Sequence, residues 1–291
     1  MKKLILLLSL ALSVTACQHQ APPAQAVAGQ PAAATPVPGT AAPKPLPTLF
    51  ATADTLNAPM RALLRQHDLA ALWQGNTDDR KDFPVLEGFF GPDHYRFAFV
   101  FNEVRRDARQ PELFHVRGKC RYRKNIRPFT GTLMLRTVVA LPDSNFQEMR
   151  ESDLGSDPGS VKTYTARARL QLREETQENS GLFEGEALLD FYLTTDQHLG
   201  YVTSVSDGLE TRNPTRGSGV LLRGKRRNAT TGQVKSFVVA GSALSASPDI
   251  YQDFAFGDRS EQINPKYAKL GWNDLWANDE WWHDSAKSPL L

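Results

Sequence analysis

Apolar and polar residues alternate along most of the chain between Tyr95 and Ala240. In the clearest run every second residue is aromatic, at Tyr95, Phe97, Phe99 and Phe101. Similar runs occupy residues 114–123, 164–173 and 183–191, and shorter ones lie near residues 200–206, 219–227 and 233–240. Successive side chains of a β-strand point to opposite faces, so the alternation predicts strands with one buried and one solvated face. Such strands are typical of antiparallel sheets.

The segments between these runs are mostly short and rich in turn-forming residues, for example Asp207-Gly208 and residues 228–232. Connections of this length join neighbouring strands as hairpins. We therefore expect a mainly β fold, an antiparallel meander of about eight to ten strands whose edges must be protected. Closure into a β-barrel is the favoured arrangement, and a β-sandwich is the alternative.

Two consecutive long runs carry opposite charges on their polar faces, and this predicts how the two strands pair. If Arg173 faces Glu184, then Arg167 faces Asp190. Cross-strand pairs of opposite charge stabilise a sheet by about 0.2–1 kcal/mol each. This register places Glu184, Glu186 and Asp190 on the solvated face.

A short helix is expected before the strands, because Asn57 is a good N-cap and Pro59 fits the first helical turn. A helix followed by a meander resembles the lipocalin-type barrels. The Gly-x-Trp motif of that superfamily is absent from the first strand, and Trp73-Gln74-Gly75 does not replace it. The resemblance implies an architecture and no particular function.

The C-terminal segment is rich in aromatic residues, which include Tyr267, Trp272, Trp276, Trp281 and Trp282. Exposed indole rings stack on sugars, which makes Trp272 and Trp276 candidate ligand-binding residues. In the alternative interpretation, these rings plug the end of the barrel or clamp the last segment onto the sheet, since Trp buries a large apolar area.

The N-terminus has the features of a secretory signal: Lys2 and Lys3 precede an apolar run of about half the length that a transmembrane helix needs. The following Val14-Thr15-Ala16-Cys17 resembles a bacterial lipobox. The resemblance implies cleavage before Cys17 and acyl chains attached to this residue. Two such chains give stable membrane anchoring. Gln18, in place of an aspartate, favours the outer membrane.

Three segments are expected along the chain. Residues 1–16 form the signal peptide, and residues 17–48 form the lipidated cysteine with a disordered tether of mostly Ala, Pro, Gln, Gly and Thr. Residues 49–291 form a single β domain, because no second linker of this composition appears. A domain of this size buries a sufficient core without disulfides.

The charge balance argues against a nucleic-acid partner. The chain has 34 Lys and Arg and 32 Asp and Glu; removal of the signal with Lys2 and Lys3 leaves 34 − 2 = 32 cations against 32 acids. A nucleic-acid-binding domain normally shows a basic excess. Local faces of one sign remain compatible with this total.

Two basic clusters follow the strands. Arg117, Lys119, Arg121 and Arg123 share one side of a strand, and Arg223, Lys225, Arg226 and Arg227 form the second cluster. Guanidinium groups bind oxyanions in bidentate fashion, so the first cluster supplies candidate ligand-binding residues for lipid phosphates or acidic glycans. In the alternative interpretation both clusters are solvated faces that pair with neighbouring acids.

The sequence offers no catalytic, cofactor or metal motif. It lacks a Gly-x-Ser-x-Gly elbow, a P-loop and a dinucleotide fingerprint, and its six His show no metal-ligand spacing. Cys120 lies on the apolar side of its strand, where a buried, inert thiol is expected. No catalytic residue, cofactor or metal is predicted.

These features favour a non-enzymatic, lipid-anchored cell-envelope protein whose β domain binds a ligand or an envelope partner. An apolar or amphiphilic ligand would enter the mouth of the barrel, with strand-borne arginines holding its anionic head. One alternative is an envelope hydrolase acting on glycans or lipids, which needs converging carboxylates or a nucleophile with its base. Another alternative is a purely structural envelope lipoprotein with a filled interior.

Overall fold

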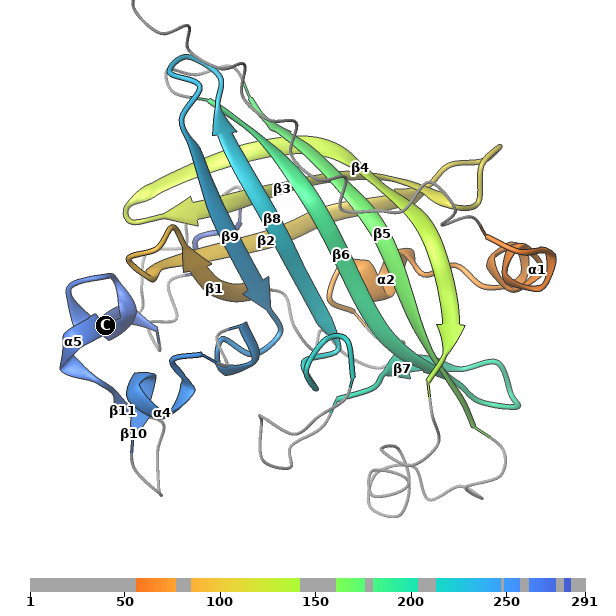
Figure 1. Ribbon diagram of the computed structural model, residues 1–291. Helices are drawn as coiled ribbons and strands as arrows, with labels where there is room; N and C mark the ends of the chain where they lie inside the picture. Colours follow the sequence, from red (N-terminus) through yellow and green to blue (C-terminus); the bar gives the residue numbers. More distant parts are fainter. Residues whose placement is uncertain are drawn as a thin grey trace, which may run out of the picture. The chain divides into compact units, whose positions relative to one another are not determined.

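Antiparallel strands dominate the computed structural model (Figure 1), which describes residues 56–76, 85–141, 161–175, 180–203, 213–246, 249–256, 262–275 and 280–283. All of these residues belong to one compact unit, Pro47–Leu291. The mainly β fold with hairpin connections is confirmed. The signal peptide, Cys17, the tether and Trp276 lie outside the described residues.

The large sheet has nine strands. They are β1 (Leu86–Phe90), β2 (Tyr95–Arg106), β3 (Leu113–Tyr122), β4 (Asn125–Ala140), β5 (Lys162–Glu174), β6 (Gly181–Leu193), β7 (Leu199–Tyr201), β8 (Val220–Asn228) and β9 (Val234–Ala240). Two further short strands, β10 (Ala255–Phe256) and β11 (Gln262–Ile263), pair with each other. Sequence analysis found the long strands but missed β1, whose Leu-Glu-Gly-Phe-Phe sequence shows no clean alternation.

The pairings connect eight of the strands in a ring. Each strand from β1 to β6 pairs with the next, β6 pairs with β8, β8 with β9, and β9 returns to β1. The short β7 pairs with the end of β6 at Phe191–Leu193, beyond the last β8 partner, Leu189. Every pairing is antiparallel, as expected from hairpins.

Aromatic side chains fill the inner face of the strands. Five buried rings are in mutual contact: Phe97, Phe99, Phe129, Phe183 and Phe237. The ring centroids of Phe99 and Phe183 are 5.2 Å apart, and those of Phe183 and Phe237 are 5.5 Å apart. These are favourable edge-to-face distances, and the rings leave the centre of the strand ring packed.

Two helices pack at one end of the strands. α1 (Ala58–Gln66) begins as predicted, with the Asn57 side chain accepting the Met60 N–H at 3.0 Å. α2 (Ala70–Trp73) was not predicted, and it packs against β2 and β7 with Trp73 buried. The Tyr201 hydroxyl donates to the Leu72 carbonyl oxygen and fixes α2 to the end of the sheet.

The C-terminal segment covers part of the outer face. It contains the 3-10 turns η3 (Leu244–Ala246) and η4 (Trp272–Asp274) and the helices α4 (Tyr251–Phe254) and α5 (Pro265–Ala268), which lie beside β1 and β9 in Figure 1. Buried residues of this segment pack on the outward residues of four strands, namely Phe89, Leu188, Leu221 and Ala240. In the described part of the chain, no helix has the length and hydropathy required to span a bilayer.

The predicted register of β5 and β6 is wrong by two residues. Gln171, instead of Arg173, faces Glu184, and Arg169 faces Glu186. The faces are nevertheless correct, because a shift of two preserves the alternation. The charges of β5 and β6 alone do not determine the register, because β8 also borders β6. Glu186 binds Arg167 of β5 at 3.0 Å and Arg223 of β8 at 2.6 Å.

Two of the three acids that the register placed on the solvated face are buried, namely Glu186 and Asp190. Asp190 is fully buried. Its Oδ1 accepts the Thr165 hydroxyl at 2.6 Å, and its Oδ2 accepts the Thr215 hydroxyl at 2.5 Å and the Thr215 N–H at 3.0 Å. Burial raises the pKa of Asp190, and the hydrogen bonds from Thr165 and Thr215 oppose this rise. Asp190 therefore ties the segment before β8 to β5 and β6.

We expect Asp190 to contribute a pH dependence to the free energy of unfolding, and we expect Asp190→Asn to remove that contribution. Because folding raises the pKa, the native state binds the proton more tightly, and its stability falls as pH rises from the unfolded to the folded pKa. Asp190→Asn keeps an acceptor for Thr215 without the charge, so its stability relative to the native protein should rise between acid and neutral pH. Asp190→Ala leaves the Thr donors unpaired and should lose about 2–4 kcal/mol at either pH.

Urea unfolding of the three proteins at pH 4 and pH 7 measures these differences. Since all other titrating groups are shared, the difference between the Asn variant and the native protein isolates Asp190. An Asn variant as unstable as the Ala variant at both pH values would contradict the assignment.

Candidate functional site

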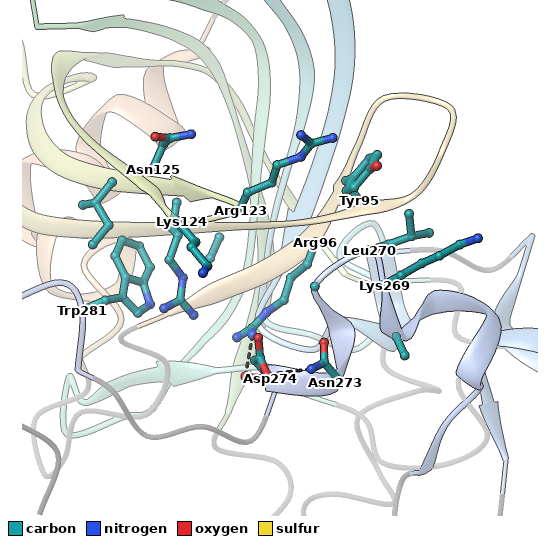
Figure 2. A pocket seen from close by; sticks show the side chains of 15 residues that line it. Tyr95, Arg96, Arg123, Lys124, Asn125, Lys269, Leu270, Asn273, Asp274 and Trp281 are labelled. Carbon is teal, nitrogen blue, oxygen red and sulfur yellow. Dashed lines mark hydrogen bonds between the residues drawn. The ribbon is translucent and has the colours of Figure 1, made fainter. Parts of the chain in front are cut away.

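A cleft of about 950 Å³ separates the outer face of β2, β3 and β4 from the C-terminal segment. Figure 2 shows the side chains around it, which include Tyr95, Arg121, Arg123, Lys124, Lys269 and Trp281. The strands contribute the start of β2, the end of β3, the β3–β4 turn and the start of β4, and the opposite wall comes from residues 268–274. The cleft therefore exists only because the last part of the chain returns to this face.

Arg96 of β2 holds the two walls together (Figure 2). Its guanidinium binds the Glu87 carboxylate in bidentate fashion, at 3.0 and 2.6 Å, and donates to the Asp274 carbonyl oxygen at 2.6 Å. Its backbone N–H donates to the Leu270 carbonyl oxygen at 2.9 Å. The Arg96 side chain is only 9% exposed, and Glu87 compensates its positive charge. Arg96 therefore has a structural role in the cleft.

Trp272 fastens the same segment from its other side. The indole is fully buried among Phe89 and Phe254, and its N–H donates to the His94 carbonyl oxygen at 2.9 Å. Trp281 likewise packs on Ala98 and Val100 of the outer face of β2. These two rings clamp the C-terminal segment to the sheet, as one of the interpretations from the sequence stated, and they do not plug the end of the strand ring.

α5 is fixed by its own hydrogen-bond network beside the cleft. The Asp253 carboxylate accepts the Tyr267 hydroxyl at 2.8 Å and pairs with the Lys266 ammonium group. Hydrogen bonds from Lys266 and then Tyr267 lower the pKa of Asp253, so the carboxylate remains charged. Lys269, in the turn after α5, is thereby placed on the cleft wall.

Two arginines of the cleft lie over aromatic rings. The Arg121 guanidinium carbon is 4.9 Å from the centroid of Trp281, and that of Arg123 is 4.5 Å from the centroid of Tyr95. Stacking of this kind orients a guanidinium and leaves its edge directed away from the ring. The cleft therefore contains two guanidinium groups, each oriented by an aromatic ring.

Most of the charged residues among the described lining of the cleft are cations. Four cations line it besides the compensated Arg96, namely Arg121, Arg123, Lys124 and Lys269. Asp274 is the only acid among the described residues of its lining. Apolar surface is also present, because Ile126 at the rim is 42% exposed and Leu270 is half-buried. This combination of charge and apolar surface suits an anionic group attached to an apolar body.

The structure brings together only part of the predicted site. Arg121 and Arg123 line the cleft, whereas Arg117 pairs with Glu103 at 3.4 Å and Lys119 donates to the His283 carbonyl oxygen at 3.1 Å. Trp272 presents no exposed ring to a ligand, and Trp276 lies outside the described residues. The Trp at the cleft is Trp281, which the sequence placed in the aromatic segment without singling it out.

Two of the four residues of the second basic cluster pair with acids, in line with the alternative interpretation. Arg223 binds Glu186, and Arg226 binds Glu174 at 2.7 Å. Glu184, Glu186 and Asp190, considered for hydrolysis, do not line the cleft. In the part of the chain that the structure describes, no three His, Cys, Asp or Glu side chains gather as a metal site.

Comparisons with protein-family models, with curated protein sequences and with solved structures give no match to this chain.

Arg96→Gln is expected to release the C-terminal wall of the cleft. The substitution leaves the partly buried Glu87 without its cation and removes the bond to Asp274, so the free energy of unfolding should fall by about 2–4 kcal/mol. Hydrogen exchange of residues 264–275 should accelerate, as measured by mass spectrometry. Arg105→Gln in the same strand is the control: that side chain is 74% exposed, and its loss should change stability by less than about 0.5 kcal/mol. Unchanged exchange in Arg96→Gln would show that Arg96 does not hold the segment.

Proposed function

We propose that this protein is a lipid-anchored component of the bacterial cell envelope, held through Cys17 at the outer membrane, whose β domain binds an anionic amphiphilic ligand in the cleft. The observation that carries the proposal is the cleft itself. Four cations besides Arg96 and two aromatic rings line one hollow, and Asp274 is the only acid among its described lining residues. The binding activity is non-enzymatic.

The fold supports this proposal as a rigid scaffold. We propose that the eight-strand ring is a closed β-barrel and not a sandwich, because β9 pairs with β1 through four consecutive residues and leaves neither strand as a free edge. A site on the outside of such a barrel keeps its geometry because the strands beneath it are paired on both sides. The ligand thus binds to a surface that is already formed.

The chemistry of the cleft defines the class of ligand. A volume of about 950 Å³ exceeds that of a single inorganic ion and lies within the usual range for organic ligands. Stacked guanidinium groups suit phosphate, sulfate or carboxylate groups, which they bind in bidentate fashion. Ile126, Leu270 and the rings of Tyr95 and Trp281 suit an apolar or sugar body.

One observation favours the purely structural alternative. The centre of the strand ring is packed with phenylalanine rings, so a lipid-sized ligand does not enter the interior in this conformation. The arginines expected to hold its head face outward on β3. The hydrolase alternative has no comparable support, since Glu186 and Asp190 are occupied by structural partners.

Binding of 8-anilinonaphthalene-1-sulfonate, an anionic aromatic probe, tests the proposal. Its fluorescence titration should show saturable binding that Arg123→Gln/Lys124→Gln weakens about five- to tenfold, because two partly exposed cations are lost. Arg169→Gln/Arg173→Gln removes two cations from the exposed face of β5 and should leave the affinity unchanged within about twofold.

Circular dichroism of each variant verifies that the probe reports on folded protein. Equal affinity of the cleft variant and the native protein would contradict the proposal and favour the structural role. Native mass spectrometry of gently purified protein then identifies any bound amphiphile.

A further inference from the structure

The β3–β4 hairpin turns at an arginine whose backbone has an unfavourable conformation. Tyr122 of β3 faces Asn125 of β4, so Arg123 and Lys124 form a two-residue loop. The turn types that such hairpins favour need a positive φ at the first loop residue, where glycine, asparagine and aspartate are common. The φ of Arg123 is +57°. An arginine at this position therefore carries a steric cost that a glycine would avoid.

The side chain of Arg123 lies on two tyrosine rings. Its guanidinium carbon is 4.5 Å from the centroid of Tyr95 and 5.3 Å from that of Tyr122. The two rings meet edge to face with their centroids 5.8 Å apart, and the centroid of the buried Phe90 ring is 4.9 Å from that of Tyr122. A chain of ring contacts thus connects the guanidinium to the core and fixes its position.

Contact with these rings does not by itself account for the arginine. Arg123 is exposed, and cation–π contacts at exposed sites stabilise a protein by an amount similar to the cost of a left-handed backbone. The two effects largely cancel, so the residue adds little to the stability of the fold. Residues with a strained backbone cluster at ligand sites, where the strain places a functional group.

Two other residues with a positive φ serve the fold instead. His94 has a φ of +57°, and its carbonyl oxygen accepts the indole N–H of Trp272. Arg216 has a φ of +56°, and its guanidinium donates to the Ser245 carbonyl oxygen at 3.1 Å. Both residues fasten one segment of the chain to another. The guanidinium of Arg123 lies on the wall of the cleft.

We propose that Arg123 is the specificity-determining residue of the cleft: its guanidinium binds the anionic group of the ligand, and the strained turn is retained because it places that group. The role rests on the proposed function of the cleft. Stacking on tyrosine rings leaves N–H groups along the edge of a guanidinium, where they suit a phosphate, sulfonate or carboxylate. Ile126, at the start of β4, provides exposed apolar surface beside the turn. The ligand class is therefore an oxyanion attached to an apolar body, and the cleft selects it over an uncharged body of the same shape.

Two fluorescent probes that differ by one sulfonate group test this role. 8-Anilinonaphthalene-1-sulfonate carries the anionic group, and N-phenyl-1-naphthylamine has the same rings without it. In titrations of the full chain, Arg123→Gly should weaken binding of the sulfonate about fivefold, as expected for one lost cation at a partly exposed site. Any affinity for the uncharged probe should change by less than about twofold, because no charge on that probe faces the arginine.

Thermal unfolding of the same variant separates this role from a structural one. Because glycine adopts a positive φ without strain, the melting temperature of Arg123→Gly should be retained or should rise by up to about 3 °C. Gln197→Gly is the matched control, since Gln197 has a φ of +71° in the β6–β7 turn and does not line the cleft. It should also raise the melting temperature, and it should leave the affinity for both probes unchanged.

Equal affinity of Arg123→Gly and the native protein for the sulfonate would overturn the proposal. An equal loss for both probes would also overturn it, because the residue would then shape the cleft without selecting charge. A melting temperature lowered by more than about 2 °C would assign Arg123 to the fold and have the same consequence.

A failure of this role is distinct from a failure of the proposed function. If Arg123→Gln/Lys124→Gln weakens binding of the sulfonate and Arg123→Gly does not, the cleft remains the ligand site and Arg123 does not select the ligand. If the native protein shows no saturable binding of the sulfonate, the proposed function is contradicted, and the role of Arg123 with it.

Discussion

The pairing of β1 with β9 is the constraint on which the rest of the structure depends. Glu87 to Phe90 face Ala240 to Phe237, and Gly88 permits this approach because a Cβ there would lie 2.0 Å from the Val238 carbonyl oxygen. The five residues of β1 then serve three regions. Phe90 joins the inner core, Phe89 supports the C-terminal segment on the outer face, and Glu87 anchors Arg96. Loss of this pairing would expose two strand edges and remove the support of the cleft.

The outer face becomes a binding surface because the chain returns to it after the last strand. In a meander, one face of each strand normally contacts water. Here, residues 264–275 cover the outward side of β1, β8 and β9, and they also lie beside the basic β3–β4 turn. Arg96 and Trp272 fix the distance between the two surfaces. The hollow is the space that this segment leaves over cationic residues of β3 and the following turn.

Local patterns predicted the elements, and contacts between distant segments decided the site. The alternation in β2, β3, β5 and β6 was sufficient to predict strands and their faces, because burial of one face requires it. It could not predict α2, where Trp73 and Leu72 fill the end of the ring, nor the register of β5 and β6, which depends on Arg223 of a third strand. Arg121 and Trp281 are 160 positions apart, and only the fold places one over the other.

The distribution of acids explains why a balanced composition coexists with a basic cleft. Glu174 and Glu186 are buried, and each binds two arginines, Arg127 with Arg226 and Arg167 with Arg223. A buried carboxylate needs such partners, because desolvation without them costs several kcal/mol. Among the described residues, each of these buried carboxylates thus engages two cations. A balanced net charge gives no general attraction to polyanions, but it does not limit how strongly a single cleft attracts one anion.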